Sequence, residues 1–172
     1  MVAQLFVTGI PGAGKTTLAG RVAKRTGRVL LSAHDLVALV DPEAIAEGRM
    51  ADEQAMRQAF VQLMGAYDGM PFVMDGWPRN AGQAQLLPPD SIVVHLRCSR
   101  SIAVERLTKR ARPDDTPDLI QARLLEQAAI FNGDWIRDLA GWSRTLNTSN
   151  RTAASVEETV MLYLDGKKRE VF

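Results

Sequence analysis

Short apolar segments rich in Val, Ile, Leu and Phe alternate along this chain with longer segments in which apolar residues recur every three or four positions. The short segments predict strands that are buried on both faces, and the longer ones predict amphipathic helices. Five strands are predicted, over residues 4–8, 28–31, 71–74, 91–96 and 143–146. The alternation indicates an α/β fold in which helices connect parallel strands.

Helix signals fill the segments between these strands. The first helix is predicted to begin at about Gly14 and to end at Gly27, because glycine readily adopts the left-handed conformation that terminates a helix. Between the second and third strands, helical segments are separated by Asp41, an expected N-cap, and Pro42, an expected first helical residue. These segments predict a small helical insert.

The longest helix is predicted to start near Thr116 and Pro117 and to fray around residues 132–133, which are Asn and Gly. Four apolar side chains are expected on its buried face: Leu119, Ile120, Leu124 and Leu125. No repeat, low-complexity tract or linker is evident, so the 172 residues are expected to form one domain.

The composition restricts the classes of partner. With 24% charged residues and a formal net charge of +1, the chain has no global field that would favour a polynucleotide or a membrane surface. One cysteine, Cys98, leaves no internal disulfide and too few thiolates for a typical structural zinc site, which fits a reducing cytoplasm. No secretion signal or apolar run of membrane-spanning length is evident, so a cytoplasmic protein is expected.

A glycine-rich segment after the first predicted strand matches the phosphate-binding loop pattern, with Gly9, Gly14, Lys15 and Thr16 at the defining positions. Because a helix is predicted to follow, backbone N–H groups and the helix dipole would converge on phosphate oxygens. Lys15 can bridge the β- and γ-phosphates of a nucleoside triphosphate, and Thr16 can ligate Mg²⁺. Residues 9–17 therefore predict a site for ATP and Mg²⁺, but GTPases, motor ATPases and small-molecule kinases all use such a loop.

Two further segments select among these classes. Residues 75–80 read Asp-Gly-Trp-Pro-Arg-Asn at the end of the third strand, with Gln83 three residues on. Residues 105–115 carry several arginines and two aspartates, and Arg123 follows them. Together with the loop, these motifs resemble, in the same order, those of the nucleoside monophosphate kinases, adenylate kinase above all. The resemblance covers nearly the whole chain, and Trp77 replaces the phenylalanine usual in the family.

The resemblance implies a P-loop fold of three layers, αβα, around a five-stranded parallel sheet in the order 2-3-1-4-5. It also implies one kinase domain over residues 1–172, with a helical acceptor-binding insert at about 32–64 and a short lid at about 108–116. Only Ala111 separates Arg110 from Arg112, as in the short-lid members of the family.

The resemblance also assigns roles at the donor site. Arg106 would pack on the adenine of ATP, Arg110 would meet the donor phosphates, and Asn150 would lie where the backbone surrounds the adenine. Thr16 would ligate Mg²⁺, and Asp75 would orient Mg²⁺-bound water. The implied ATP-binding residues are Gly9, Pro11, Gly12, Ala13, Gly14, Lys15, Thr16, Thr17, Arg106, Arg110 and Asn150.

At the acceptor site, the resemblance implies that Arg79 holds the acceptor phosphate and that Gln83 reads the edge of the acceptor base. Asp114 and Asp115 would fix the arginines or latch the lid. The implied acceptor-binding residues are Ser32, Asp35, Arg49, Met50, Gly76, Trp77, Arg79, Gln83, Arg112 and Arg123. The implied catalytic residues are Lys15, Arg79, Arg110, Arg112 and Arg123. Such cations are needed because two phosphorylated substrates repel each other, and because phosphoryl transfer depends on positioning and electrostatic stabilisation.

The chain departs from the family pattern after the second strand. Ala33 and Ala38 replace a threonine and the arginine that grips the acceptor phosphate, and His34 and Arg49 are candidate substitutes. Three functions therefore stay open. The first is a monomeric kinase that transfers phosphate from ATP to a nucleoside monophosphate, with AMP favoured. The others are a P-loop kinase for another small acceptor and a nucleotide-binding module without catalysis.

Overall fold

The predicted strands form one parallel sheet in the computed structural model, which describes residues 4–47, 49–112, 115–131, 134–136 and 142–166. The strands are β1 (Leu5–Gly9), β2 (Val29–Ser32), β3 (Phe72–Asp75), β4 (Ile92–Arg97) and β5 (Trp142–Asn147). Their order is β2-β3-β1-β4-β5, which confirms the predicted P-loop topology. Each strand lies within about one residue of its predicted position.

The central strand β1 shows why the apolar residues of a strand are continuous in this sequence and do not alternate with polar ones. Leu5 lies opposite Val73 of β3 on one side and opposite Ile92 of β4 on the other. All five residues of β1 are buried, because helices cover both faces of the sheet. The sheet edge at β2 is different, since Val29 and Leu30 are exposed.

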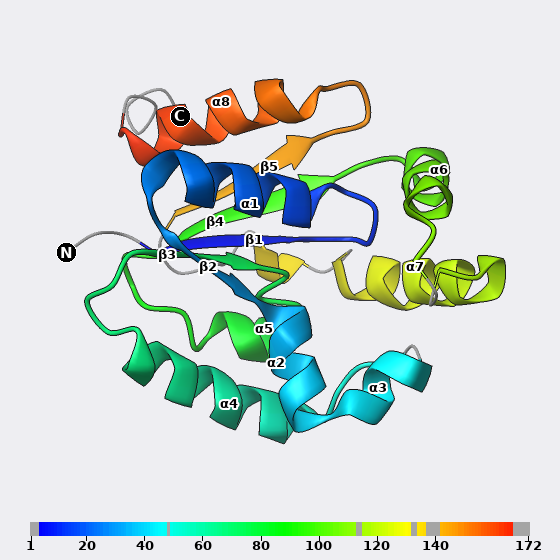
Figure 1. Cartoon of the computed structure of the whole chain (residues 1–172), viewed down its shortest axis with the longest axis horizontal. Helices are drawn as coiled ribbons and strands as arrows, with labels where there is room; N and C mark the ends of the chain where they lie inside the picture. Colours follow the sequence, from blue (N-terminus) through cyan, green and yellow to red (C-terminus); the bar gives the residue numbers. More distant parts are fainter. Residues whose placement is uncertain (1–3, 48, 113–114, 132–133, 137–141, 167–172) are drawn as a thin grey trace.

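Helices form a layer on each face of this sheet (Figure 1). On one face α1 (Lys15–Thr26) packs beside α8 (Ala153–Leu164), and both contribute to an apolar core with the sheet. On the other face lie α2 (Ala33–Val40), α3 (Pro42–Glu47), α4 (Glu53–Ala66) and α5 (Ala81–Ala84). The core on that face includes Phe60 of α4 and Trp77, whose rings stack with centroids 4.4 Å apart.

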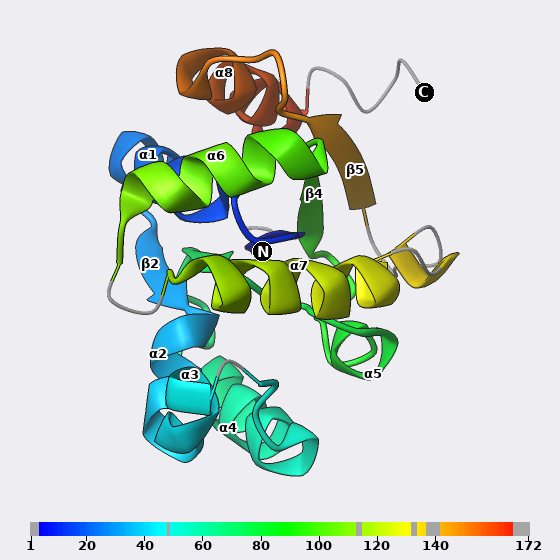
Figure 2. The same ribbon diagram turned by 90° about the vertical axis from the view of Figure 1, so that its right-hand side faces the viewer.

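Two further helices lie beyond the carboxyl ends of the strands. These are α6 (Arg100–Arg110) and α7 (Pro117–Phe131), which cross in front of the sheet in Figure 2. They pack on each other through a small apolar cluster of Ala103, Leu107, Ile120 and Leu124. A 3₁₀ turn, Asp134–Ile136, follows α7.

The helix ends follow the predicted signals. Gly27 ends α1 in the left-handed conformation, with a φ of 68°. The backbone N–H of Ala44 donates to Asp41 Oδ1 across 3.2 Å, so Asp41 caps α3, which begins at Pro42 as expected. The predicted face of α7 is partly wrong, because Leu125 is 59% exposed whereas Ile120 and Leu124 are buried. The predicted fraying at residues 132–133 lies outside the described residues.

Among the described residues, no helix has the length and apolar character needed to cross a membrane.

Candidate active site

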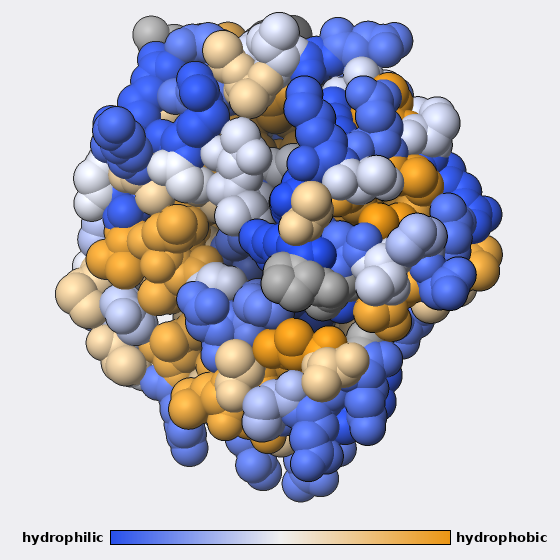
Figure 3. Space-filling model, turned by 45° about the vertical axis from the view of Figure 1, so that its right-hand side comes forward, coloured by the Kyte–Doolittle hydropathy of each residue, from blue (hydrophilic) through white to orange (hydrophobic). Residues whose placement is uncertain are grey.

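A cavity of about 510 Å³ opens at the carboxyl ends of β1 and β3, between the glycine-rich loop, the insert helices and α7. Parallel α/β sheets commonly bind ligands at this edge. In the space-filling view, hydrophilic atoms gather in the middle of the face that presents these elements, with a group of apolar atoms to their left (Figure 3). The cavity brings together side chains that lie far apart in the sequence.

The glycine-rich loop that lines the cavity requires glycine at two positions. A Cβ on Gly9 would lie 2.1 Å from the carbonyl oxygen of Leu96, and a Cβ on Gly12 would lie 2.7 Å from that of Ala103. Both glycines also have positive φ angles, 136° and 76°, which other residues rarely adopt. The loop therefore passes tightly between β4 and α6, and this close packing fixes its path.

Lys15 begins α1, and its Nζ donates to the carbonyl oxygen of Ile10 across 2.8 Å. Burial lowers the pKa of Lys15 to about 8. The nearby carboxylate of Asp75 opposes this shift, whereas the charges of Arg79 and Arg110 reinforce it. Phosphate oxygens bound beside Lys15 would stabilise its buried ammonium group, which lies among other cations.

Thr16 and Asp75 are joined directly, since Thr16 Oγ1 donates to Asp75 Oδ2 across 2.6 Å. The other carboxylate oxygen, Oδ1, is buried and has no hydrogen-bond partner within the described part of the chain. A buried carboxylate oxygen without a partner is unfavourable unless a cation or water satisfies it. A hydroxyl and a carboxylate are ligands of the kind that Mg²⁺ prefers, so this pair fits the predicted metal position.

Arg106 of α6 is hydrogen-bonded to the glycine-rich loop and to the residue that follows β5. Its Nη1 donates to the carbonyl oxygen of Gly12 at 3.2 Å, and its Nη2 donates to that of Thr148 at 2.7 Å. The Thr148 hydroxyl in turn lies 3.0 Å from the carbonyl oxygen of Ala13. Thr148 therefore fastens the loop, α6 and the end of β5 together, a role that no local motif indicates.

Three of the predicted arginines gather around the short segment between α6 and α7. Asp115 accepts hydrogen bonds from Arg110 Nε and Nη2, at 2.8 and 2.7 Å, and lies 3.5 Å from Arg123 Nη1. The bond from Arg110 holds the pKa of Asp115 below its usual value. Arg112 lines the same cavity and is exposed. Asp114, which was expected to share the role of Asp115, lies outside the described residues.

Arg79 lies on the opposite wall of the cavity, in the loop after β3. Its Nε donates to the carbonyl oxygen of Gly76 across 3.1 Å. Burial lowers the pKa of the Arg79 guanidinium, while the carboxylates of Asp75 and Glu126 raise it. Glu126 lies one turn beyond Arg123 on α7 and also lines the cavity. The acceptor motif did not point to this carboxylate.

Three of the predicted acceptor residues do not line the cavity, and two of them, Trp77 and Gln83, are buried. Trp77 is fully buried and stacks on Phe60, so it belongs to the core and not to a wall of the site. Gln83 is 1% exposed, and its side chain bonds within the protein. Gln83 Oε1 accepts from the backbone N–H of Arg79 at 2.8 Å, and Gln83 Nε2 donates to Glu53 Oε2 at 3.0 Å. Both the oxygen and the nitrogen of its amide are therefore hydrogen-bonded within the protein.

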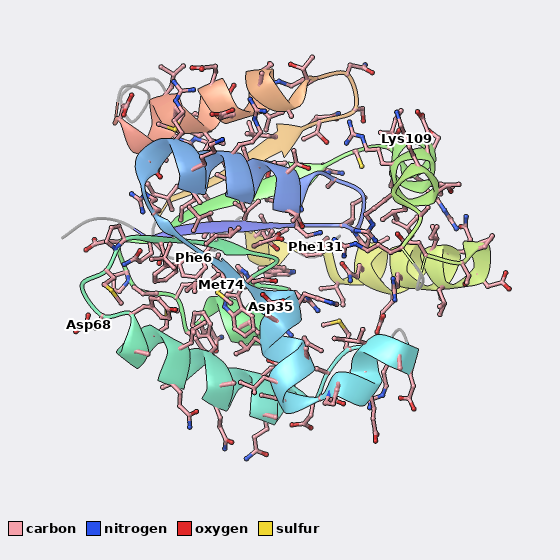
Figure 4. The ribbon with its side chains drawn as sticks, in the orientation of Figure 1. Phe6, Asp35, Asp68, Met74, Lys109 and Phe131 are labelled. Atoms are coloured by element: carbon pink, nitrogen blue, oxygen red, sulfur yellow. The ribbon has the colours of Figure 1, made fainter. Side chains whose placement is uncertain are left out.

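The insert places its predicted residues unequally. Ser32 lines the cavity and caps α2, accepting from the backbone N–H of His34 at 3.2 Å. Arg49 and Met50 also line it, as does His34. Asp35 lies on α2 (Figure 4) and is exposed outside the cavity lining.

The remaining donor residues are placed as follows. Gly14 and Thr17 line the cavity, as do Gly9, Pro11 and Gly12. Two of the predicted residues are outside the lining: Ala13 is fully buried, and Asn150 is an exposed turn residue. Sequence reasoning also missed several lining residues, which carry no recognisable motif: Val37, Ala44, Ile45, Leu107, Glu126 and Gln127.

Two further titratable residues, His95 and Cys98, lie outside the cavity lining. His95 is buried in β4 and stacks on Phe131 of α7, with ring centroids 5.3 Å apart. Burial lowers the pKa of His95 to about 4, and the charges of Arg97 and Lys15 add to the shift. Burial raises the pKa of the Cys98 thiol, so the thiolate is disfavoured. Neither residue lines the cavity described above.

The sheet order, the phosphate-binding loop and the cationic cavity define a P-loop kinase for small molecules. A family model described as "AAA domain" matches residues 5–128. An adenylate kinase of Synechococcus sp. (strain CC9311) is 32% identical over 146 residues, which cover 74% of this chain and 80% of that protein. An adenylate kinase of Synechococcus sp. (strain WH7803) is 34% identical over 142 residues, which cover 72% and 78%. The chain belongs to the adenylate kinase family.

Solved structures with the same fold extend this comparison. A sugar kinase of Janibacter sp. HTCC2649 superposes with a TM-score of 0.77 at 21% identity, covering 96% of this chain and 95% of that one. A gluconokinase of Sinorhizobium meliloti 1021 superposes with a TM-score of 0.74 at 17% identity, covering 96% and 93%. At these identities the likeness concerns the fold.

Proposed function

We propose that this protein transfers the γ-phosphoryl group of ATP to the phosphate of a nucleoside monophosphate, with AMP favoured by the family relationship. The observation that carries the proposal is the charge of the cavity. Among the described residues that line it, seven are basic and two are acidic. Mg²⁺-bound ATP and a nucleoside monophosphate together carry about four net negative charges, which such a cavity would neutralise.

The cations surround the cavity from several elements, so they suit two phosphorylated ligands that meet in the middle. Lys15 and Arg106 flank the glycine-rich loop and serve the donor. Arg79 lies just after β3 and would serve the acceptor phosphate. Arg110 comes from α6, Arg112 from the segment between α6 and α7, and Arg123 from α7. All of these side chains come from one chain and one domain, so we propose that the protein acts as a monomer.

Mg²⁺ completes the donor half of the proposal. Thr16 and Asp75 would hold the ion, directly or through water, and Asp75 Oδ1 is the buried oxygen that such a ligand would satisfy. The described residues contain no cluster of three or more His, Cys, Asp or Glu side chains suited to a metal. This agrees with a metal that is held partly by nucleotide phosphates, as in other P-loop proteins. When bound, Mg²⁺ neutralises charge on the transferring phosphate.

The residues then act by position and charge, because phosphoryl transfer needs no protein nucleophile. Lys15 would contact the β- and γ-phosphates from the loop side. Arg79 would hold the acceptor phosphate in line with them, and Arg123 would stabilise the charge that spreads over the equatorial oxygens. Asp115 would keep Arg110 and Arg123 oriented between turnovers, because it already binds both.

A second candidate is a kinase that phosphorylates a hydroxyl group of a small polyol. The observation that favours it is Glu126, a carboxylate in the cavity that is close enough to Arg79 to oppose the lowering of the Arg79 pKa by burial. A carboxylate at this position would repel an acceptor phosphate, but it could accept the proton of an attacking hydroxyl. Ala38, where the family has a phosphate-binding arginine, points in the same direction.

One assay separates these candidates. The protein is incubated with ATP and Mg²⁺ and with AMP, GMP, CMP, UMP, dTMP or gluconate in turn, and both nucleotide and acceptor products are quantified. Conversion of a nucleoside monophosphate into its own diphosphate, beyond the acceptor-free control, supports the proposal. Phosphorylation of gluconate alone would establish the second candidate. ATP binding without turnover of any acceptor would identify a nucleotide-binding module and contradict both.

A further inference from the structure

We propose that the acceptor site accepts purine and pyrimidine nucleoside monophosphates with little discrimination between their bases. This inference rests on the proposed function, since it concerns the acceptor half of the same cavity. It departs from the role that the family resemblance implies for Gln83. The inference is based on the residues that would surround an acceptor base.

The position of the base follows from the position of the phosphates. The glycine-rich loop and Lys15 occupy one end of the cavity, and Arg79 and Gly76 lie beside them at the end of β3. An acceptor whose phosphate binds Arg79 must extend its nucleoside away from the donor, toward α2, α3 and the segment after α3. The wall there is largely apolar: Val37, Ala44, Ile45 and Met50. An apolar wall recognises the flat faces of all bases alike.

The residue expected to read the base edge is already occupied. Gln83 uses its carbonyl oxygen for the Arg79 N–H and its amide nitrogen for Glu53 Oε2. Glu53 Oε2 also accepts from Asn80 Nδ2 at 2.9 Å, and Glu53 Oε1 is buried without a partner in the described part of the chain. Withdrawing Gln83 to contact a base would leave this buried carboxylate with still fewer hydrogen bonds, which is unfavourable.

Arg49 is committed in a similar way. Its Nη1 and Nη2 bind the two oxygens of Asp41 at 2.9 and 3.2 Å, and its Nε binds Glu47 at 2.5 Å. These bonds hold the guanidinium at the rim of the insert. Two other polar side chains line the cavity at the start of α2. The Ser32 hydroxyl accepts from the backbone N–H of His34 at 3.2 Å, and the His34 ring can present a donor or an acceptor according to its tautomer. Such a ring can pair with a keto oxygen, a ring nitrogen or an amino group, and so it selects weakly.

The energetic consequence is a limit on selectivity. A site built to hydrogen-bond one substrate group rejects analogues by about 10⁴- to 10⁵-fold, whereas an apolar site discriminates by only about 10- to 200-fold. We therefore expect kcat/KM for AMP, GMP, CMP and UMP to fall within about 200-fold of one another. AMP can be the preferred member of this set without excluding the others.

The test measures kcat/KM for all four monophosphates with the wild-type protein. A spread of about 200-fold or less supports the proposal, and a larger spread overturns it while leaving the proposed kinase function intact. Absence of turnover with every monophosphate contradicts the proposed function itself, so the two failures are distinguishable.

A variant tests the role of Gln83 separately. Gln83→Met keeps the volume of the side chain but removes both hydrogen bonds, and Glu53→Gln perturbs the same network from α4. If Gln83 acts only by positioning Arg79, a given substitution lowers kcat/KM for all four monophosphates by one common factor. The ratios of kcat/KM between the monophosphates then stay within about twofold of their wild-type values. A loss for AMP that exceeds the loss for UMP by tenfold or more would show that Gln83 reads adenine, and it would overturn the proposal.

Discussion

Thr16 Oγ1 and Asp75 Oδ2 lie 2.6 Å apart, so a hydrogen bond joins the first turn of α1 to the last residue of β3. The bond connects the phosphate-binding loop to the segment that carries Arg79. It also fixes one oxygen of Asp75 and leaves the other, which is buried, for a further ligand. The donor and acceptor motifs of the sequence therefore meet at this pair.

The first prediction concerns the charge of Asp75. Asp75→Asn keeps the shape of the side chain and an oxygen for Thr16, but it removes the negative charge that would attract Mg²⁺. We expect kcat with Mg²⁺ and ATP to fall roughly 100-fold, with ATP binding in the absence of Mg²⁺ little changed. Steady-state kinetics and calorimetry measure the two quantities. Asp90→Asn, which removes an exposed carboxylate outside the cavity, is the matched control, and an equal loss in both variants would contradict the assignment.

The second prediction concerns pH and Lys15. Its pKa is about 8 in the unliganded protein, and bound phosphates would raise it, because they stabilise the ammonium form. Below pH 8 the group is already protonated, so the titration of Lys15 should not change ATP affinity with pH there. Above pH 8, binding must take up a proton, and affinity should fall toward tenfold per pH unit. Titrations from pH 7 to 9.5 test this. The residual binding of Lys15→Arg should show no inflection, because a guanidinium stays charged throughout.

The third prediction concerns Arg79. Arg79→Ala removes a buried guanidinium that would make charge-assisted hydrogen bonds with the acceptor phosphate, each worth about 1.5–3 kcal/mol. We expect KM for the monophosphate to rise roughly 100-fold, with KM for ATP changed much less. Arg57→Ala serves as the control, since Arg57 donates to the carbonyl oxygen of Gly82 and does not line the cavity. An unchanged acceptor KM in Arg79→Ala would place the acceptor phosphate elsewhere.

The fourth prediction is a gain of function at Ala38. This residue is exposed on α2, one turn beyond His34 and next to Val37, both of which line the cavity. Residues four apart on a helix share one face, so an arginine at position 38 can reach the acceptor phosphate. We expect Ala38→Arg to lower KM for the monophosphate about tenfold, the effect of one added charge contact. Leu39→Arg adds the same charge at a side chain that is 78% exposed and outside the lining, and it should have little effect.

The fifth prediction concerns acid stability. His95 has a pKa of about 4 in the folded protein, whereas an unfolded histidine titrates at about 6.5. Between these values only the unfolded state takes up the proton, so the stabilising effect is complete above pH 6.5 and is lost as the pH falls through 4. The loss reaches roughly 2–3 kcal/mol by pH 4.5. Urea unfolding at pH 7 and 4.5 should show that His95→Leu loses correspondingly less. Equal losses in the two proteins would mean that other groups govern acid unfolding.

Local signals in the sequence predicted most of the fold and the donor loop. Strands and helix ends were recoverable because burial pattern, N-caps and terminal glycines act over a few residues, as at Asp41 and Gly27. Leu125 was misassigned because the helical pattern alone cannot tell which side of α7 the neighbouring elements leave uncovered. The loop glycines were recoverable for a similar reason, since the phosphate-binding conformation needs them at fixed spacing.

The sequence by itself determined the P-loop kinase family and the set of cations that one cavity would contain. Only the tertiary structure decided which of the predicted site residues face the cavity and which bond within the protein. Thr148 supports Ala13 from 135 positions away, and Glu53 of the insert binds Gln83 from 30 positions away. Such contacts depend on how helices pack across the sheet, and no local pattern records them. The physical reason is that a buried polar group must find a partner in three dimensions, and the partner that Gln83 finds removes it from the cavity.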